Sequence, residues 1–231
     1  MDMYKIFHNN KEYFEDFISR NTYHSNAIEG STLTYADTYA IIFNDNSYIV
    51  KAEPREIYEA INHKYALDYA LNNMIKSDYE LKAEDIIKIN SCINKNINEF
   101  TGYRKGSVAI RGASEIPPKS FQVPSLMMQL IYDFNSSDIR NEDLFKKIAQ
   151  FHIQFEHIHP FDDGNGRTGR ILINQQLMKN GLAPIVIAKE DKSKYIEYLD
   201  SYNIEEFAKF IEELELAEEK RIEAFSKENN I

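Results

Sequence analysis

Apolar residues recur every three to four positions along most of this chain, the spacing that places them on one face of an α-helix. Good helix formers such as Ala, Leu, Glu and Lys fill the positions between them. The pattern predicts helices over residues 10–18, 35–43, 53–74, 83–97, 123–135, 141–157, 165–179 and 192–226. Only residues 107–112 and 114–118 read as extended chain. We therefore expect a mainly α fold with one small hairpin.

The size of the chain fits one packed unit. It has 231 residues, of which 43% are hydrophobic, and this is enough for one well-packed core. The sequence shows no internal repeat, no low-complexity tract and no long linker rich in Gly, Ser or Pro. We therefore expect a single domain over residues 1–231.

The charge balance and the cysteine content limit the environment and the partners. A formal net charge of −10 argues against a general nucleic-acid surface, because phosphate binding there depends on clustered Lys and Arg. Cys92 is the only cysteine, so an intrachain disulfide is excluded and a reducing cytoplasm fits best. Neither a signal peptide nor an apolar run of membrane-spanning length is present in the sequence. We expect a soluble cytoplasmic protein that binds neither nucleic acid nor a membrane.

The candidate chemistry concentrates in residues 159–170, which read His-Pro-Phe-Asp-Asp-Gly-Asn-Gly-Arg-Thr-Gly-Arg. Gly164, Asn165 and Gly166 can adopt unusual backbone angles that point successive N–H groups into one concavity, and such a concavity binds anions. Helical spacing resumes directly afterwards. The turn is therefore predicted at a helix N-terminus, where unpaired amides and the positive end of the helix dipole favour phosphate.

The charged residues of the same segment complete a nucleotide site. Arg167 and Arg170 lie three positions apart, so both guanidinium groups can reach phosphate oxygens or a carboxylate in bidentate fashion. Asp163 precedes the turn, where its carboxylate could hold Mg²⁺ while the nucleotide supplies other oxygens. His159 has an ordinary pKa near 6.5 and could accept a proton from a hydroxyl at neutral pH. The segment predicts transfer of part of a nucleotide.

The complete string resembles the signature of the Fic family, His-Pro-Phe-x-Asp/Glu-Gly-Asn-Gly-Arg-x-x-Arg, with every required position filled. The resemblance implies a helical bundle with a short β-hairpin flap, and a protein adenylyltransferase (AMPylator) that transfers AMP from ATP to a hydroxyl side chain of a target protein. It makes His159 the catalytic base and Asp163 the Mg²⁺ ligand. The nucleotide-binding groups implied are Gly164, Asn165, Gly166, Arg167 and Arg170 around the phosphates and Tyr195 and Asn203 around the adenine.

Two further segments resemble parts of Fic proteins. Residues 102–118, with Val108, Ala109 and Ile110 at their centre, resemble the β-hairpin flap that pins a target segment by strand addition. Near the N-terminus, residues 22–30 resemble the family's inhibitory helix, whose motif is Ser/Thr-x-x-x-Glu-Gly/Asn.

The inhibitory motif implies a restrained enzyme. Ser25 and Glu29 are four positions apart and would share a helix face, and Gly30 would end that helix. By resemblance, Glu29 pairs with Arg170 and occupies the site that the γ-phosphate of ATP needs. We therefore expect autoinhibition by Glu29.

Several alternatives stay open at this level. Some Fic relatives remove AMP, with the inhibitory glutamate helping to position water, and others transfer UMP, phosphocholine or phosphate. A non-catalytic regulator that binds nucleotide and a partner is a further alternative, although the intact His159 weighs against it. The sequence leaves open the target protein, modification of the chain by itself, a homo-oligomer and what relieves the inhibition.

Overall fold

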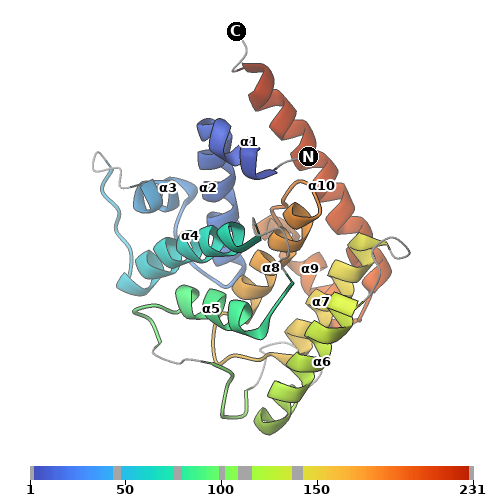
Figure 1. Ribbon diagram of the computed structural model, residues 1–231. Coiled ribbons are helices and arrows are strands. Elements are labelled where there is room, and N and C mark those ends of the chain that lie inside the picture. The colour runs from blue at the N-terminus through green and yellow to red at the C-terminus, as the bar shows by residue number, and fades with distance from the viewer. Residues whose placement is uncertain are drawn as a thin grey trace.

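The structure, a computed structural model, describes residues 3–43, 48–74, 80–98, 102–108, 116–136 and 143–228. Within these ranges the chain is mainly helical and contains no strand (Figure 1). The helices are α1 (Met3–Asn9), α2 (Lys11–Ile28), α3 (Tyr35–Phe43), α4 (Pro54–Met74), α5 (Ala83–Ile93), α6 (Val123–Ser136), α7 (Leu144–Ile158), α8 (Asn165–Lys179), α9 (Lys192–Asp200) and α10 (Ile204–Glu228), with the short 3₁₀ helices η1 (Ser120–Gln122) and η2 (Lys189–Asp191).

The predicted mainly α fold is confirmed, and most helices have close to their predicted bounds. The N-terminal segment differs, because one continuous helix, α2, replaces the separate helices predicted at 10–18 and 22–30. It ends where predicted, at Gly30, whose φ of 104° lies in the left-handed region that favours glycine. The predicted helix 192–226 was wrong as a single element: Tyr202 adopts a φ of 52°, and Asn203 Oδ1 accepts a hydrogen bond from Glu206 N at the start of α10.

Helix α8 lies at the centre of the core. Its side chains at Ile171, Leu172 and Leu177 are almost completely buried, and even its polar Asn174 and Gln175 are shielded from solvent. A helix that is buried all round must be enclosed by neighbours, and α2, α4, α5 and α7 all pack against it (Figure 1). The N-terminus of α8 is consequently held in place from several sides.

A buried polar cluster ties α2 to α10. Tyr13 donates a hydrogen bond to Glu218 at 3.0 Å, and Arg20 pairs with the same carboxylate at 2.6 Å. Arg20 also contacts Asp16, which accepts two hydrogen bonds from Arg221. These partners compensate the burial of the Glu218 charge. The cluster fixes one end of α2 against α10, while the other end reaches the N-terminal half of α8.

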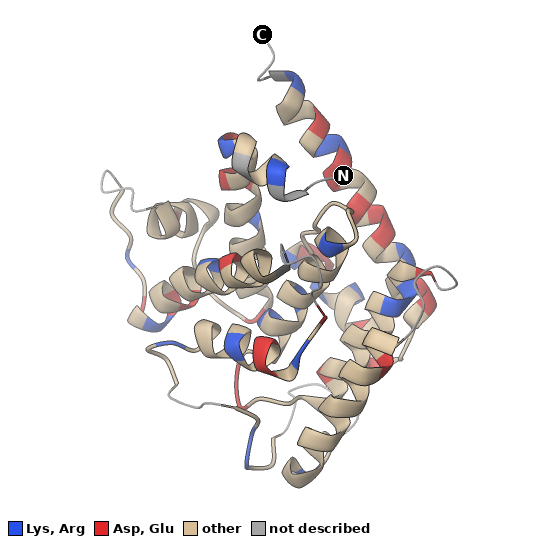
Figure 2. Cartoon of the chain, in the orientation of Figure 1, with Lys and Arg blue, Asp and Glu red and all other residues tan. Residues whose placement is uncertain are grey.

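Charge is distributed unevenly over the helices. Figure 2 shows acidic and basic residues along most of α10, whereas α6 is almost free of them. No helix in the part of the chain that the structure describes is both long and apolar enough to cross a membrane.

The predicted flap, residues 102–118, is described only at its two ends. Residues 102–108 and 116–118 form turns and irregular chain, and neither stretch contains a strand. Val108 belongs to the first stretch, whereas Ala109 and Ile110, which were predicted to bind the target, lie outside the described residues. The hairpin predicted here is therefore not seen at its described ends.

Candidate active site

The loop between α7 and α8 carries the signature and is fixed by its own polar groups. His159 ends α7 with a left-handed φ of 49°, which directs the chain away from the helix axis. Gly164 also has a positive φ, 78°, and begins α8 as its N-cap residue. The Asn165 side chain accepts a hydrogen bond from Phe161 N and donates one to Phe161 O, both at 2.9 Å. Because Phe161 is buried in the core, the loop is anchored between two helices.

Arg104 clamps the same loop from the flap. Its Nε donates to the carbonyl oxygen of His159 at 2.7 Å, and its Nη2 donates to the carbonyl oxygens of Ile158 and Pro118. Its backbone N–H donates to the carbonyl oxygen of Pro160 at 2.9 Å. The side chain is nearly fully buried. One residue therefore connects both ends of the flap to the backbone that carries His159.

A cavity of about 890 Å³ joins the predicted catalytic residues. Its lining includes His159, Gly166 at the start of α8, and Arg170 one turn later. Glu29 lines it from the end of α2, and Tyr195 lines it from α9. The volume lies within the range of pockets that hold nucleotide-sized ligands. Residues from three separate parts of the sequence are thus brought around one space.

His159 is prepared to act as a base. Burial lowers the pKa of its imidazole below the ordinary value of 6.5, and the nearby positive charge of Arg104 acts in the same direction, although the Glu156 carbonyl opposes them. His159 Nδ1 lies 3.3 Å from that carbonyl oxygen, which can only accept a hydrogen bond. This contact assigns the proton to Nδ1 and leaves Nε2 with a free lone pair.

Arg170 is held by the last turn of α2. Its Nε donates to Ser25 Oγ at 3.0 Å, and its Nη2 donates to the Ser25 carbonyl oxygen at 2.9 Å and to Glu29 Oε1 at 2.7 Å. Burial raises the pKa of Glu29, but the charge of Arg170 and its hydrogen bond outweigh this and hold the pKa below its ordinary value of 4.5. Glu29 is therefore ionised at neutral pH and faces the cavity. The predicted pairing of Glu29 with Arg170 is observed within one chain.

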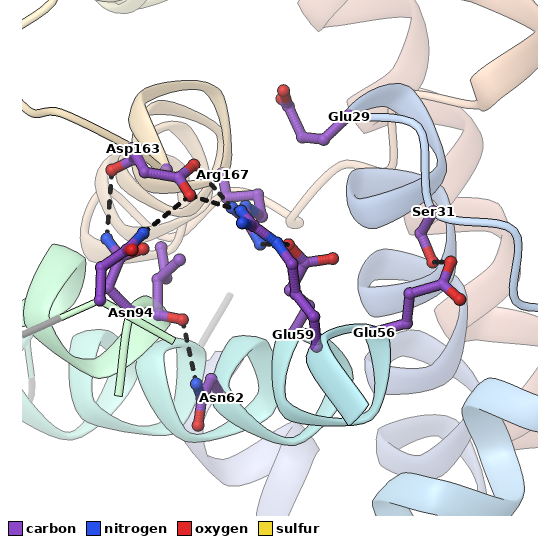
Figure 3. A network of polar contacts seen from close by, with 12 residues as sticks. Glu29, Ser31, Glu56, Glu59, Asn62, Asn94, Asp163 and Arg167 are labelled. Atoms are coloured by element: carbon purple, nitrogen blue, oxygen red, sulfur yellow. Dashed lines mark hydrogen bonds and ion pairs between the residues drawn. The ribbon is translucent and has the colours of Figure 1, made fainter. Parts of the chain in front are cut away.

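Arg167 points away from Arg170, toward α4. Its guanidinium pairs with Asp163 Oδ1 at 3.1 Å and with Glu59 Oε1 at 3.2 Å (Figure 3). Arg55, also on α4, donates to the same Glu59 oxygen at 3.0 Å and to Asp163 Oδ2 at 2.6 Å. Two arginines and two carboxylates thus alternate in a closed ring, which we call the charge ring (Arg55, Glu59, Asp163 and Arg167).

Three asparagines on and after α5 hold Asp163 from the other side. Asn90 and Asn94 each donate to the Asp163 carbonyl oxygen, at 2.9 and 3.1 Å, and Asn98 donates to the Asp163 carboxylate at 3.1 Å (Figure 3). Asn90 also donates to Thr168 Oγ1 in the first turn of α8. The sharp bend before Gly164 is therefore stabilised by side chains far away in the sequence.

Asp163 carries the carboxylate that could hold a divalent cation. Its carboxylate is 28% exposed and lies next to the first turn of α8. Mg²⁺ usually takes only one or two protein carboxylates and receives its other oxygens from phosphate and water. Arg55 covers Oδ2 of this carboxylate, so the guanidinium has to move before a cation can reach it.

Tyr195 supports the site from behind Arg170. It is fully buried, and its hydroxyl lies 2.7 Å from His152 Nε2. Burial lowers the pKa of His152 to about 3, so this imidazole is neutral. Burial also raises the pKa of Glu156 to about 8, against the attraction of Arg170, and its Oε1 finds no hydrogen-bond partner among the described residues. Glu156 is thus a neutral acid at the edge of the cavity.

Asn203, the second residue predicted near adenine, is not among the described residues that line the cavity. It is exposed at the start of α10, where its side chain accepts the hydrogen bond from Glu206. Among the described residues that line the cavity, the nearest in sequence is Tyr202.

Comparison with known proteins places this geometry in a family. The model of the Fic/DOC family matches residues 80–177, a range that covers α5 through most of α8. The chain contains a Fic/DOC domain. A protein adenylyltransferase Fic of Nematostella vectensis is 30% identical over 206 residues, which are 89% of this chain and 48% of that protein. One from Drosophila erecta is 32% identical over 197 residues, which are 83% of this chain and 39% of that protein.

The Fic fold is confirmed by solved structures. A Fic domain containing signaling protein from Bacteroides thetaiotaomicron superposes with a TM-score of 0.83 at 24% identity, covering 94% of this chain and 90% of that one. At this identity the likeness establishes the fold alone. The chain spans about half the length, or less, of the curated relatives it matches.

Sequence reasoning missed the residues that reach this Fic signature from α4 and α5. Arg55 and Glu59 stand four apart, a spacing that indicates a helical ion pair but not a contact with Asp163. Asn90, Asn94 and Asn98 repeat every four positions, and this polar stripe was a usable signal. Arg104 was predicted only as one position of the flap segment, residues 102–118.

Proposed function

We propose that this protein is an adenylyltransferase that transfers AMP from ATP to a hydroxyl side chain of a target protein. The observation that carries the proposal is the common cavity, whose lining includes His159, Gly166 at the N-terminus of α8, and Arg170. The names of the curated relatives support the same activity. The single cysteine, Cys92, supports a reducing cytoplasm as the place of action.

The nucleotide phosphates would lie at the N-terminus of α8. Backbone amides of Gly164, Asn165 and Gly166 and the positive end of the helix dipole favour phosphate oxygens there. Arg170 would orient the γ-phosphate, and Arg167 would support the turn through Asp163. When Mg²⁺ is bound at Asp163, it supplies positive charge that stabilises the phosphates. Tyr195 and Asn203 are the proposed neighbours of adenine.

The reaction would proceed by a single displacement. His159 Nε2 takes the proton of the target hydroxyl, and the hydroxyl oxygen forms a bond to the α-phosphorus of ATP. The bond between the α-phosphorus and the bridging oxygen breaks, so pyrophosphate leaves and AMP remains on the target. Val108, Ala109 and Ile110 of the flap would align the target segment by strand addition. The protein contributes position and charge, as in other phosphoryl-type transfers.

Glu29 would restrain this activity. Its carboxylate pairs with Arg170 at 2.7 Å. By the family resemblance, it would take the position that a γ-phosphate needs. Since an anionic phosphate and an anionic carboxylate compete for one guanidinium, ATP binds productively only when Glu29 moves away.

Removal of AMP from a modified target is the second candidate function. One observation favours it: the Glu29 side chain is 39% exposed and faces the cavity that also contains His159. A carboxylate in this position could orient a water molecule for attack on a phosphodiester.

Labelled ATP distinguishes the two functions. Wild type, Glu29→Gly and His159→Ala are incubated with ATP labelled at the α-phosphorus, Mg²⁺ and a cell lysate, and protein-bound label is counted. We expect strong labelling by Glu29→Gly, little by wild type and none by His159→Ala, with nucleotide binding retained in the last variant. No label from any variant that still binds ATP would contradict the transferase and favour AMP removal. Wild type should then release label from proteins that a separate adenylyltransferase has labelled, and Glu29→Gly should not.

A further inference from the structure

In the charge ring, the guanidinium group of Arg55 contacts Asp163, the carboxylate that is predicted to bind the metal. Arg55 Nη2 lies 2.6 Å from Asp163 Oδ2, while Arg167 holds the other oxygen, Oδ1, at 3.1 Å. Asn98 donates to Oδ2 as well. Both oxygens of this carboxylate are therefore already engaged by donors, and a divalent cation has to displace at least one of them.

The two arginines of the charge ring differ in how easily their side chains can move away from Asp163. The Arg167 side chain extends from α8 toward α4 and is only 2% exposed, so moving it would leave a buried charge without its partners. The Arg55 side chain is 56% exposed and comes from the first turn of α4. It also keeps a second partner, because its Nε contacts Glu59 Oε1 at 3.0 Å, four residues along the same helix. Arg55 can release Asp163 without losing its ion pair with Glu59.

We propose that Arg55 sets the affinity of the site for divalent cations by competing with them for the Asp163 carboxylate. A guanidinium and a cation cannot occupy Oδ2 together, and the two positive charges repel each other at this range. Metal binding then requires Arg55 to swing toward Glu59 and solvent. The inference rests on the proposed function only in taking Asp163 as the metal ligand.

Direct metal binding tests the inference without using catalysis. The protein is saturated with an ATP analogue whose α,β-bridging oxygen is replaced by CH₂, and Mn²⁺ is titrated while free Mn²⁺ is followed by electron paramagnetic resonance. Arg55→Ala should bind Mn²⁺ roughly two- to fivefold more tightly than wild type, the range of an exposed ion pair. Lys51→Ala is the matched control, because it removes the same charge from an exposed position four residues upstream. It should bind like wild type.

Two further variants make the result decisive. Arg55→Lys keeps the charge but lacks the fork that holds Glu59 and Asp163 together, so its affinity should lie between those of wild type and Arg55→Ala. Asp163→Asn should weaken Mn²⁺ binding. If Asp163→Asn weakens Mn²⁺ binding while Arg55→Ala leaves it unchanged, the proposed role of Arg55 is wrong. The assignment of Asp163 as the metal ligand is then kept. If Asp163→Asn has no effect, the metal ligand of the proposed function is itself wrong, and the inference fails with it.

Discussion

Glu29 Oε1 lies 2.7 Å from Arg170 Nη2, although 141 positions separate the two residues in the sequence. Ser25, one turn earlier on α2, accepts a hydrogen bond from Nε of the same arginine at 3.0 Å. Two side chains at the end of one helix therefore determine the orientation of the guanidinium that faces the cavity.

Removing the Glu29 carboxylate should activate the protein. A charge-assisted hydrogen bond contributes roughly 1.5–3 kcal/mol, so Glu29→Gly should raise the initial rate of AMP transfer about tenfold to a hundredfold. Glu29→Gln is the matched control, because it keeps the shape of the side chain and loses its charge. Its rate should lie between those of wild type and Glu29→Gly. The rate is measured as label incorporated from ATP labelled at the α-phosphorus. Equal rates for wild type and Glu29→Gly would show that the ion pair does not limit the reaction.

The pH profile should report the lowered pKa of His159. Burial shifts this pKa below 6.5, so the neutral base is already present at pH 7 and is lost only as the pH falls through the lower value. In the Glu29→Gly background, kcat/KM should rise with pH, with the midpoint of the rise below pH 6.5, and then stay level to pH 8. A break in the pH profile at or above pH 7 would mean that a group other than His159 is the essential proton acceptor.

Glu156 should make the folded state progressively less stable as the pH rises from 4.5 to about 8. Its pKa is raised from 4.5 to about 8, so between these values only the folded state holds the proton. The free energy of unfolding should then fall by up to about 1.4 kcal/mol per pH unit over this interval. Glu156→Gln mimics the neutral acid and should flatten the decline in urea unfolding between pH 6 and 8. The exposed Glu212→Gln should leave the slope as in wild type, and parallel slopes in all three proteins would contradict the assignment.

Arg104 should act on catalysis by positioning the loop that carries His159. It donates to the His159 carbonyl oxygen at 2.7 Å, so Arg104→Met should let the imidazole shift. We expect kcat to fall roughly tenfold to a hundredfold while nucleotide affinity changes little, because Arg104 does not touch the first turn of α8. Arg104→Lys, which can serve fewer carbonyl oxygens, should recover part of the rate. A parallel loss of nucleotide affinity would instead indicate a general collapse of the loop.

The sequence was most informative where the chemistry is local. From residues 159–170 the start of α8 and the turn before it could be predicted, because backbone angles and helix position follow from neighbouring residues. The pairing of Glu29 with Arg170 came only through family resemblance. Nothing in the local pattern indicates which buried arginine a distant carboxylate will meet.

Long-range contacts explain what the pattern could not predict. Residues 19–21 fall between the predicted helices 10–18 and 22–30, yet α2 continues through them. Asn21 donates a hydrogen bond to the Ile185 carbonyl oxygen, and the hydroxyl of the neighbouring Thr22 lies 3.2 Å from His63 Nδ1. Arg55 and Glu59 read as an ordinary surface pair, and only the packing of α4 beside α8 brings them to Asp163. Tertiary contacts override local propensity at such positions.

The contact between α2 and Arg170 is formed within a single chain, and this has a kinetic consequence. The fraction of molecules that carry the closed ion pair is independent of protein concentration, because closing it is a unimolecular event with a fixed effective concentration. Under the proposed restraint by Glu29, a signal that switches the protein on has to weaken this contact, either by moving the end of α2 or by competing directly for Arg170.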